Sequence, residues 1–433
     1  MRMYDIIYKK RMGEALTREE IEFVIDRYVK EEIPDYQISA LLMAICFNGM
    51  SKEETYNLTD VMMKSGDLVD LSSVDGICVD KHSTGGVGDK TTLIVAPIVA
   101  SLGAKVAKMS GRGLGFTGGT VDKLESIPGY RTSLSSDEFL DNVRKCGIAV
   151  TGQSGNLCPA DKKLYALRDV TATVDSIPLI ASSIMSKKLA SGADTIVLDV
   201  KTGNGAFMKT YDGSYALAEA MVEIGKGFNK NIRALITDMN APLGKSIGNS
   251  LEVIEAIEVL SGNGDQDLYD VCIALSANII SASFNMEYSD AEKKCKDAIS
   301  SGAALDKMRE WVAMQGGDVA YIDNPKKLFV SPVKKDYCIK ASGYVSEIHA
   351  ENIGIASMLL GAGRKTKNDI IDLGAGIVLK VKVGEYVDEN QPIATMYTSD
   401  SAKLADCEKM LDKAFKLTKE KPEKAKLIHT ITK

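Results

Sequence analysis

Histidine is scarce in this chain of 433 residues, which contains only His82, His349 and His429. A transition-metal site with several imidazole ligands is therefore not expected, and any imidazole acid–base chemistry near the glycine segments described below depends on His82. The eight cysteines form no Cys-x-x-Cys pair, and most lie in apolar stretches. They indicate reduced, buried thiols rather than disulfides or zinc ligands, as in a cytoplasmic protein.

Long apolar runs and an excess of positive charge are also missing. No window approaches 18 uncharged apolar residues, so we expect no membrane span, and the N-terminal residues lack the apolar segment of a signal peptide. The net charge of −6 argues against a nucleic acid or an anionic membrane as a partner. Hydrophobic residues make up 45% and charged residues 26%, as in a globular protein, and the length predicts two or three domains.

Glycine, in contrast, is abundant, and two segments combine it with hydroxyl and basic side chains. Lys108–Glu125 contains five glycines, one serine, two threonines and three basic residues. Upstream, Asp80–Thr92 contains three glycines with Lys81, Ser83 and Thr92 beside them. Glycine lets backbone N–H groups approach a ligand closely, and hydroxyls and cations complete a cradle for an anion, most often phosphate. Two such segments around one strand–helix unit predict a phosphate-handling enzyme.

Neither segment fits the common nucleotide-binding motifs. The Gly-Lys-Ser sequence at 244–246 has Met239 in place of the first glycine of a Walker A loop, which weakens a kinase or ATPase interpretation. Gly113, Gly115 and Gly118 have the spacing of a dinucleotide-binding loop. No acidic residue stands at the end of a clear next strand about 20 residues further on, so a hydride-transfer enzyme is the less favoured alternative.

The apolar pattern predicts helices first and then a sheet. Thr17–Glu20 and Ser51–Glu54 are capping boxes, and each opens an amphipathic stretch. Further on, strand-like runs such as Gly76–Val79 and Ala104–Ala107 alternate with helical stretches, which is the βαβ pattern of a mostly parallel sheet. Both glycine segments follow such a strand, where these sheets bind ligands.

Two helix-like stretches interrupt this alternation at 161–190, and the second starts near Pro178. They can pack back on the N-terminal helices, which would make the helical domain discontinuous. The predicted class is α/β, with a discontinuous helical domain, a larger α/β domain with a mostly parallel sheet, and a small C-terminal β-rich, barrel-sandwich-like domain. The expected boundaries are 1–66 and 161–190 for the helical domain, 70–160 and 191–330 for the α/β domain, and 331–433 for the C-terminal domain.

Three segments, Lys81–Thr92, Ser110–Glu125 and Ala160–Leu179, together closely resemble the thymidine/pyrimidine-nucleoside phosphorylase family. The likeness covers essentially the whole chain in the same domain order, and Ser110–Glu125 is the most specific motif. The resemblance implies the same three domains and a homodimer. It also implies a pyrimidine nucleoside and inorganic phosphate as partners, with no nucleic acid and no membrane.

The resemblance also implies a set of site residues. The implied phosphate ligands are Lys81, Ser83, Thr92, Lys108, Ser110 and Thr120. The implied pyrimidine ligands are Arg168, Ser183 and Lys187, with Tyr165 nearby. His82 is the implied leaving-group partner, so the catalytic set is His82, Arg168 and Lys187.

Bacterial members of the family also bind a potassium ion, and no organic cofactor is implied. The positions that match its ligands are the backbone carbonyls of Gly88, Lys90, Leu243 and Ser246 and the carboxylate of Glu255. The side chains at 90 and 246 vary among relatives, which ligation by carbonyl groups tolerates.

Two positions refine the resemblance. Phe116 stands where many relatives carry histidine, so a role for that histidine does not transfer here. Lys108 is the lysine of the broad-specificity pyrimidine branch, where the thymidine-restricted branch tends to have methionine. A lysine there is suited to donate to a ribose 2′-OH, which favours uridine as well as thymidine as a substrate.

The implied reaction is reversible phosphorolysis in pyrimidine salvage, with phosphate attacking C1′ and with Arg168, Lys187 and a protonated His82 stabilising the departing base. The alternative enzyme is a phosphoribosyltransferase such as anthranilate phosphoribosyltransferase, which needs carboxylates for Mg²⁺–pyrophosphate. Before residue 200, the Asp-Glu pair 137–138 lies in a capping box and looks structural. A lipoyl-type carrier is a third alternative, suggested by Gly376–Val387, but the lysine tip that such a carrier modifies is missing.

Overall fold

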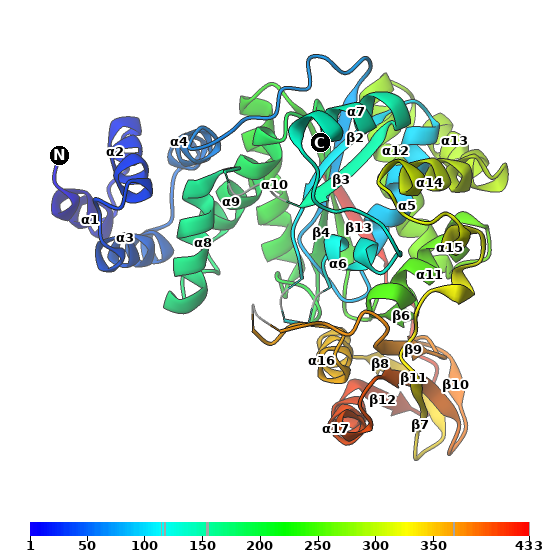
Figure 1. The fold of residues 1–433 in the computed structure, drawn as a ribbon. Coiled ribbons are helices and arrows are strands. Elements are labelled where there is room, and N and C mark those ends of the chain that lie inside the picture. Colours follow the sequence, from blue (N-terminus) through cyan, green and yellow to red (C-terminus); the bar gives the residue numbers. More distant parts are fainter. Residues whose placement is uncertain (114, 117, 153–155, 367–368, 433) are drawn as a thin grey trace.

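The computed structural model describes residues 1–113, 115–116, 118–152, 156–366 and 369–432. Figure 1 shows a helical domain on the left, a central sheet with helices around it, and a smaller β-rich domain at the bottom. The chain passes from the helical domain to the sheet, returns to the helical domain, and then adds further strands to the sheet. It next forms the β-rich domain and returns to the central sheet with its last strand. The predicted fold class is confirmed.

The helical domain contains two segments that are far apart in the sequence. The first comprises α1 (Met3–Arg11), α2 (Arg18–Val29), α3 (Asp35–Asn48) and α4 (Lys52–Met63), and the second comprises α8 (Pro159–Thr171) and α9 (Ile177–Ala190). Both predicted capping boxes are present, with Thr17 and Ser51 as the N-caps of α2 and α4. Leu164 of α8 and Leu179 of α9 share a buried apolar cluster with Leu58 of α4.

The central sheet has the strand order β13-β5-β4-β1-β2-β3. Its strands are β1 (Cys78–Ser83), β2 (Lys105–Ser110), β3 (Ile148–Gly152), β4 (Thr195–Thr202), β5 (Asn231–Asp238) and β13 (Ile428–Thr432). The first five pair in parallel, and only β13, among the described strands of this sheet, pairs antiparallel with its neighbour. The prediction of a mostly parallel sheet is therefore confirmed.

Helices cover both faces of this sheet, so its strands are buried on both sides, as their continuous apolar runs require. Val197 of β4 packs in the core of one face, while its neighbours Ile196 and Leu198 pack in the core of the other. The first face is covered by α5 (Thr91–Ser101), α11 (Asn249–Leu260), α12 (Gln266–Phe284), α13 (Tyr288–Ser300) and α14 (Ala303–Met314). The second is covered by α7 (Ser136–Cys146), α9 and α10 (Tyr211–Gly227).

One helix of the described part of the chain, α12, is long and apolar enough to cross a membrane by length and composition. Of its most apolar window, 67% is buried inside the protein. Leu275 and Ile279 of this helix lie in the main hydrophobic core beside β4 and β5. Its apolar character is therefore accounted for by packing against the sheet.

The C-terminal domain contains two small sheets, with the orders β10-β8-β12 and β6-β9-β11-β7. Their strands are β6 (Ser246–Ile247), β7 (Val333–Cys338), β8 (Gly343–Ile348), β9 (Gly376–Leu379), β10 (Tyr386–Val387), β11 (Pro392–Thr398) and β12 (Phe415–Thr418). The helices here are α16 (Ala350–Leu360) and α17 (Leu404–Ala414), with the short η2 (Ser401–Lys403). The remaining short elements are α6 (Thr120–Glu125), α15 (Ala320–Asp323) and η1 (Pro325–Lys327).

Two strands cross the boundary that the sequence predicted at residue 330. β6, which precedes α11 in the α/β part, pairs with β9 of the C-terminal domain. β13, at the end of the chain, pairs with β5 of the central sheet. The β-rich domain is therefore attached to the α/β domain by main-chain hydrogen bonds in both directions.

Candidate active site

The residues predicted to bind phosphate lie at the carboxyl ends of neighbouring parallel strands and in the segments that follow them. Lys81 and Ser83 belong to the end of β1, and Lys108 and Ser110 belong to the end of β2. Thr92 lies in the first turn of α5, directly after the β1 loop, and Thr120 is the first residue of α6. This edge of a parallel sheet is where such folds bind their ligands.

Lys81 is buried among oxygen atoms of β4, of the loop that follows β1 and of the start of α5. Its ammonium donates to the hydroxyl of Thr91 and lies 3.7 Å from carboxylate oxygens of Asp89 and Asp199. Burial opposes ionisation of Asp89, but the charges of Lys81 and nearby lysines outweigh it and hold the pKa of that carboxyl well below its usual range. The end of β1 therefore presents a lysine whose ammonium is already positioned by carboxylates and a hydroxyl.

Asp80 lies between two lysines, of which the sequence had indicated only one. Its carboxylate is 3.3 Å from the ammonium of Lys108 and 2.7 Å from that of Lys188 on α9. Burial lowers the pKa of Lys108 to about 8, and the charges of Lys188 and Lys81 add to this effect. Lys188 was missed because an adjacent pair of lysines on a helix usually indicates a solvated face, whereas Lys188 is buried.

His82 is half-buried on β1 and surrounded by positive charge. Removal of the imidazole from water is the main cause that holds the pKa of His82 well below its usual range, followed by the charges of Lys188, Lys108, Lys81 and Lys187. This environment favours the neutral imidazole, which can donate through one N–H and accept at the other nitrogen.

The residues predicted to bind the pyrimidine lie on α8 and α9. The ammonium of Lys187 donates to the hydroxyl of Ser183 at 3.0 Å and forms an ion pair with Asp161. These contacts join two consecutive turns of α9 to α8. Tyr165 is 43% exposed, and its ring lies 5.8 Å from the guanidinium carbon of Arg168.

Arg168 is buried and largely committed to the backbone. Its guanidinium donates to the carbonyl oxygens of Thr173, Val174 and Leu179 at 2.8 to 3.1 Å. Three of its five N–H donors are used in this way, so two remain for a ligand. Arg168 therefore shapes the connection between α8 and α9.

The glycine-rich segment after β2 is held by Asp122, whose role no sequence motif indicated. Asp122 accepts from the backbone N–H of Gly113 at 2.7 Å and forms a bidentate pair with Arg364 at 2.8 and 3.0 Å. Arg364 follows α16 of the C-terminal domain, and its carbonyl accepts from the N–H of Gly115 at 2.9 Å. Residues 114 and 117 lie outside the described residues. The C-terminal domain thus fixes one wall of the predicted phosphate site.

Phe116, which replaces the histidine of many relatives, lies against α16. A Cβ atom added at Gly354 would be 2.9 Å from the Phe116 ring, so only a glycine permits this close approach.

The positions that match potassium ligands are brought together, but a side chain lies among them. The ammonium of Lys90 donates to the carbonyls of Leu243 and Ser246 and to the carboxylate of Glu255. The carbonyl of Gly88 accepts from the backbone N–H of Lys90 at 3.0 Å. Elsewhere in the described residues, no group of three or more His, Cys, Asp or Glu side chains is placed to hold a metal ion.

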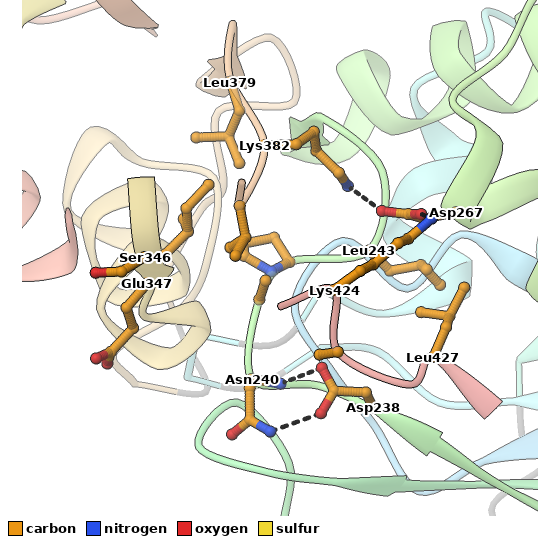
Figure 2. A pocket seen from close by; sticks show the side chains of 15 residues that line it. Asp238, Asn240, Leu243, Asp267, Ser346, Glu347, Leu379, Lys382, Lys424 and Leu427 are labelled. Carbon is orange, nitrogen blue, oxygen red and sulfur yellow. Dashed lines mark hydrogen bonds and ion pairs between the residues drawn. The ribbon is translucent and has the colours of Figure 1, made fainter. Parts of the chain in front are cut away.

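Among the cavities beside the predicted site residues, two have an appreciable volume. One of about 940 Å³ is lined by the end of β2, including Ser110, and by residues of the α7 region such as Thr132 and Phe139. A smaller one of about 170 Å³ lies between the α/β and C-terminal domains, and Figure 2 shows Leu243, Lys382 and Asp267 around it. Of the predicted site residues, the first includes only Ser110 and the second only Leu243.

Comparison with protein families matches all three domains. The helical bundle domain of the glycosyl transferase family matches residues 4–66, and the a/b domain of that family matches residues 75–305. The C-terminal domain of pyrimidine nucleoside phosphorylase matches residues 344–418. The fold and these matches define the class of protein: it is a glycosyltransferase of the pentosyltransferase type.

Whole-chain similarity narrows the class. A pyrimidine-nucleoside phosphorylase from Staphylococcus epidermidis is 54% identical over 432 residues, covering 100% of this chain and 99% of the relative. One from Geobacillus stearothermophilus is 56% identical over 400 residues, covering 92% of each chain. The chain belongs to the pyrimidine-nucleoside phosphorylase family, as its motifs indicated.

A more distant solved structure shares the fold. Anthranilate phosphoribosyltransferase from Thermus thermophilus superimposes with a TM-score of 0.56 at 18% identity, covering 72% of this chain and 99% of that chain. At this identity the likeness concerns the fold alone, and it adds no support for a phosphoribosyltransferase activity.

Proposed function

We propose that this protein catalyses the reversible phosphorolysis of uridine, thymidine and deoxyuridine to the free base and (2-deoxy)ribose 1-phosphate, in pyrimidine salvage. One observation carries the proposal. Lys188, the neighbour of Lys187 on α9, donates to the carboxylate of Asp80 on β1 at 2.7 Å and to the carbonyl of Met109 on β2 at 3.3 Å. This contact supports a site in which the residues proposed to bind the pyrimidine lie near the strand ends that carry the residues proposed to bind phosphate.

The chemistry follows from where charge develops. An oxygen of phosphate forms a bond to C1′ of the sugar while the bond from C1′ to the base nitrogen breaks, and the electron pair of that bond goes to the base. The lysines around β1 and β2 attract the phosphate dianion, and its negative charge stabilises the positive charge on the sugar. No covalent enzyme intermediate is required.

The base leaves as an anion delocalised over its carbonyl oxygens. The ammonium of Lys187 and the two free N–H groups of Arg168 are the donors suited to those oxygens. Neutral His82 contributes one N–H hydrogen bond rather than a full positive charge. Because the two sets of ligands belong to different domains, closure of the helical domain onto the sheet would complete the site.

The amount of uracil released from uridine, with and without phosphate, tests the proposal. We expect release to require phosphate and to produce one ribose 1-phosphate for each uracil. Equal release without phosphate would identify a hydrolase instead. A reaction that needs phosphoribosyl pyrophosphate and is abolished by EDTA would identify a phosphoribosyltransferase.

Substrate breadth is the part of the proposal that depends on Lys108. Its ammonium uses two of its three N–H donors, on Asp80 and on the carbonyl of Lys81. One donor remains for a ribose 2′-OH, which supports the acceptance of uridine together with the deoxynucleosides.

We also propose a homodimer located in the cytoplasm. Four large side chains of α1 and α3 are exposed, with Phe47 at 82%, and a second copy could cover them: Tyr4, Tyr8, Tyr36 and Phe47. All eight cysteines are free thiols, which suits a reducing compartment. Light scattering after size exclusion would test the dimer, and a monomer at micromolar concentration would contradict it.

A further inference from the structure

The side chain of Lys90 is the cation of a buried oxygen cage. Lys90 is 1% exposed, and its ammonium lies 3.0 Å from the carbonyl oxygen of Leu243, 2.9 Å from that of Ser246 and 2.5 Å from the carboxylate of Glu255. An ammonium group has three N–H donors, and these three acceptors use all of them. The positive charge of Lys90 and the negative charge of Glu255 balance within the cage.

The cage is built from tight backbone rather than from adaptable side chains. Gly244 has a φ of +71°, and a Cβ atom there would lie 2.7 Å from the Glu255 carboxylate. Gly88 has a φ of +74°, and a Cβ atom there would lie 2.5 Å from the carbonyl oxygen of Leu243. Both positions favour glycine, because a side chain is strained at such φ values and would collide with the cage oxygens.

Further hydrogen bonds fix the oxygens of the cage in place. The Glu255 carboxylate accepts from the backbone N–H groups of Lys245 and Ser246 at 2.7 and 2.9 Å. The ammonium of Lys382, from the C-terminal domain, donates to the carbonyl of Gly244 at 3.2 Å. Figure 2 shows Lys382 directed toward Asp267 beside Leu243. The Glu255 carboxylate and the backbone beside it are therefore held by contacts other than those to Lys90.

Carbonyl and carboxylate oxygens around a monovalent charge are the ligands of a potassium ion as well as of an ammonium group. Both cannot be present here, since a potassium ion beside the Lys90 ammonium would leave a buried excess positive charge. The residues of this chain therefore do not fit the potassium ion that the family resemblance implies.

We propose that Lys90 replaces a bound monovalent cation, so that this protein is independent of potassium, and that shortening Lys90 creates a potassium site. Lys90 is the N-cap of α5, directly before Thr91 and Thr92. The cation is therefore part of a residue in the predicted phosphate loop, and it also binds carbonyl groups of the loop before α11. The proposal concerns stability and ion binding, and it holds whichever nucleoside the enzyme uses.

The melting temperature of the full-length protein in potassium chloride and in choline chloride, at equal ionic strength, tests the proposal. We expect the wild-type melting temperature to be the same in both salts. Lys90→Ser should melt several degrees lower in choline, because Glu255 is left as an unpaired buried charge. Potassium should restore at least half of that loss with saturable dependence on its concentration.

Two controls separate ion binding from general salt effects. Lys90→Met fills the space without a charge, so it should melt lower than wild type in both salts. Lys409→Ser removes a lysine that is 75% exposed in its side chain, so it should behave as wild type. A specific, saturable stabilisation of the wild type by potassium would overturn the proposal, as would a folded Lys90→Ser that does not respond to potassium.

A second variant covers the case in which Lys90→Ser does not fold. Lys90→Met combined with Glu255→Gln removes both charges and should fold, because no unpaired charge is buried. Its failure to fold would contradict the view that Lys90 acts by balancing Glu255. Independently of any variant, the rate of uracil release by the wild type should be equal in the two salts, and a severalfold gain in potassium would overturn the proposal.

Discussion

The ammonium of Lys188 on α9 lies 2.7 Å from the carboxylate of Asp80 on β1. The same ammonium donates to the carbonyl of Met109 on β2 at 3.3 Å. The helical insert is therefore joined directly to the two strands that carry the predicted phosphate ligands. Because Lys187 is the next residue on α9, this contact also places the residue proposed to bind the pyrimidine close to these strands.

Replacing Lys188 by methionine should destabilise the protein and impair catalysis. Asp80 keeps Lys108 as a partner, so we expect a loss of about 1–3 kcal/mol in the free energy of unfolding, the cost of one missing partner for a buried charge. Urea denaturation measures this loss, and kcat/KM for uridine should fall as α9 loses its contact with the sheet. The exposed Lys162 on α8 is a matched control, and Lys162→Met should change little. Equal urea midpoints for the two variants would show that the contact contributes nothing.

His82 should titrate well below pH 6.5, the value of an unperturbed histidine. Proton NMR of the imidazole measures this pKa. Inorganic phosphate should raise the pKa of His82, because a nearby negative charge favours the imidazolium form. Lys188→Met should also raise this pKa, because Lys188 is the lysine whose charge lowers it most. A pKa of 6.5 or higher before phosphate is added would contradict the neutral ring.

The same depressed pKa has a consequence for stability. As the pH falls through 6.5, the unfolded chain takes up a proton at His82 that the folded protein does not, so the free energy of unfolding declines. Between pH 6.5 and the pKa of His82 in the folded protein, the free energy of unfolding should therefore fall less in His82→Asn than in the wild type. Chemical denaturation across this pH range compares the two proteins.

The parts of the fold that follow from local patterns could be predicted from the sequence. The capping boxes of α2 and α4 and the strands β1 to β5 depend on neighbouring residues and on periodicity, and the structure contains all of them. The short β13 was not predicted, because it follows an exposed charged stretch and gains its place only by pairing with β5.

The contacts that complete the site could not be predicted from one sequence. Lys188 and Asp80 are 108 residues apart, Lys90 and Glu255 are 165 apart, and Arg364 and Asp122 are 242 apart. In each case a charged side chain that would ordinarily be solvated is buried because a distant element supplies its partner. Only the family resemblance predicted that Lys90 and Glu255 lie near each other. It assigned the ligand role to the backbone carbonyl of Lys90 rather than to its ammonium.

Substitutions of Lys81 and Arg168 should separate the two substrates. Lys81→Ala should raise KM for phosphate with a smaller effect on KM for the nucleoside, and Arg168→Ala should do the reverse. Loss of one charged hydrogen bond costs about 1.5–3 kcal/mol, which corresponds to roughly 10- to 150-fold in kcat/KM. Initial rates with each substrate varied in turn measure the split, and both variants retaining wild-type constants would refute the assignment of the site.

Arg168 needs a further comparison because it also holds the backbone of the connection between α8 and α9. Arg168→Lys keeps the charge but cannot donate to three carbonyl groups and a ligand at once. We expect it to lower the melting temperature and to recover only part of the nucleoside KM. Full recovery of KM with a lower melting temperature would show that charge alone binds the base.

Lys108 should control the preference between ribose and deoxyribose. Its one free N–H is suited to the 2′-OH, so Lys108→Met should reduce kcat/KM for uridine about tenfold more than kcat/KM for deoxyuridine, the effect of one hydrogen bond from a charged group.

The pKa of Lys108 of about 8, lowered mainly by burial, adds a pH dependence that can be measured on the wild type. As the pH rises through about 8, the ammonium loses its proton and becomes a weaker donor. The ratio of kcat/KM for uridine to that for deoxyuridine should therefore fall in this range, and the change in phosphate ionisation cancels because both nucleosides use the same phosphate. In Lys108→Met the ratio should be lower and independent of pH, and a ratio that stays constant with pH in the wild type would exclude Lys108 from sugar recognition.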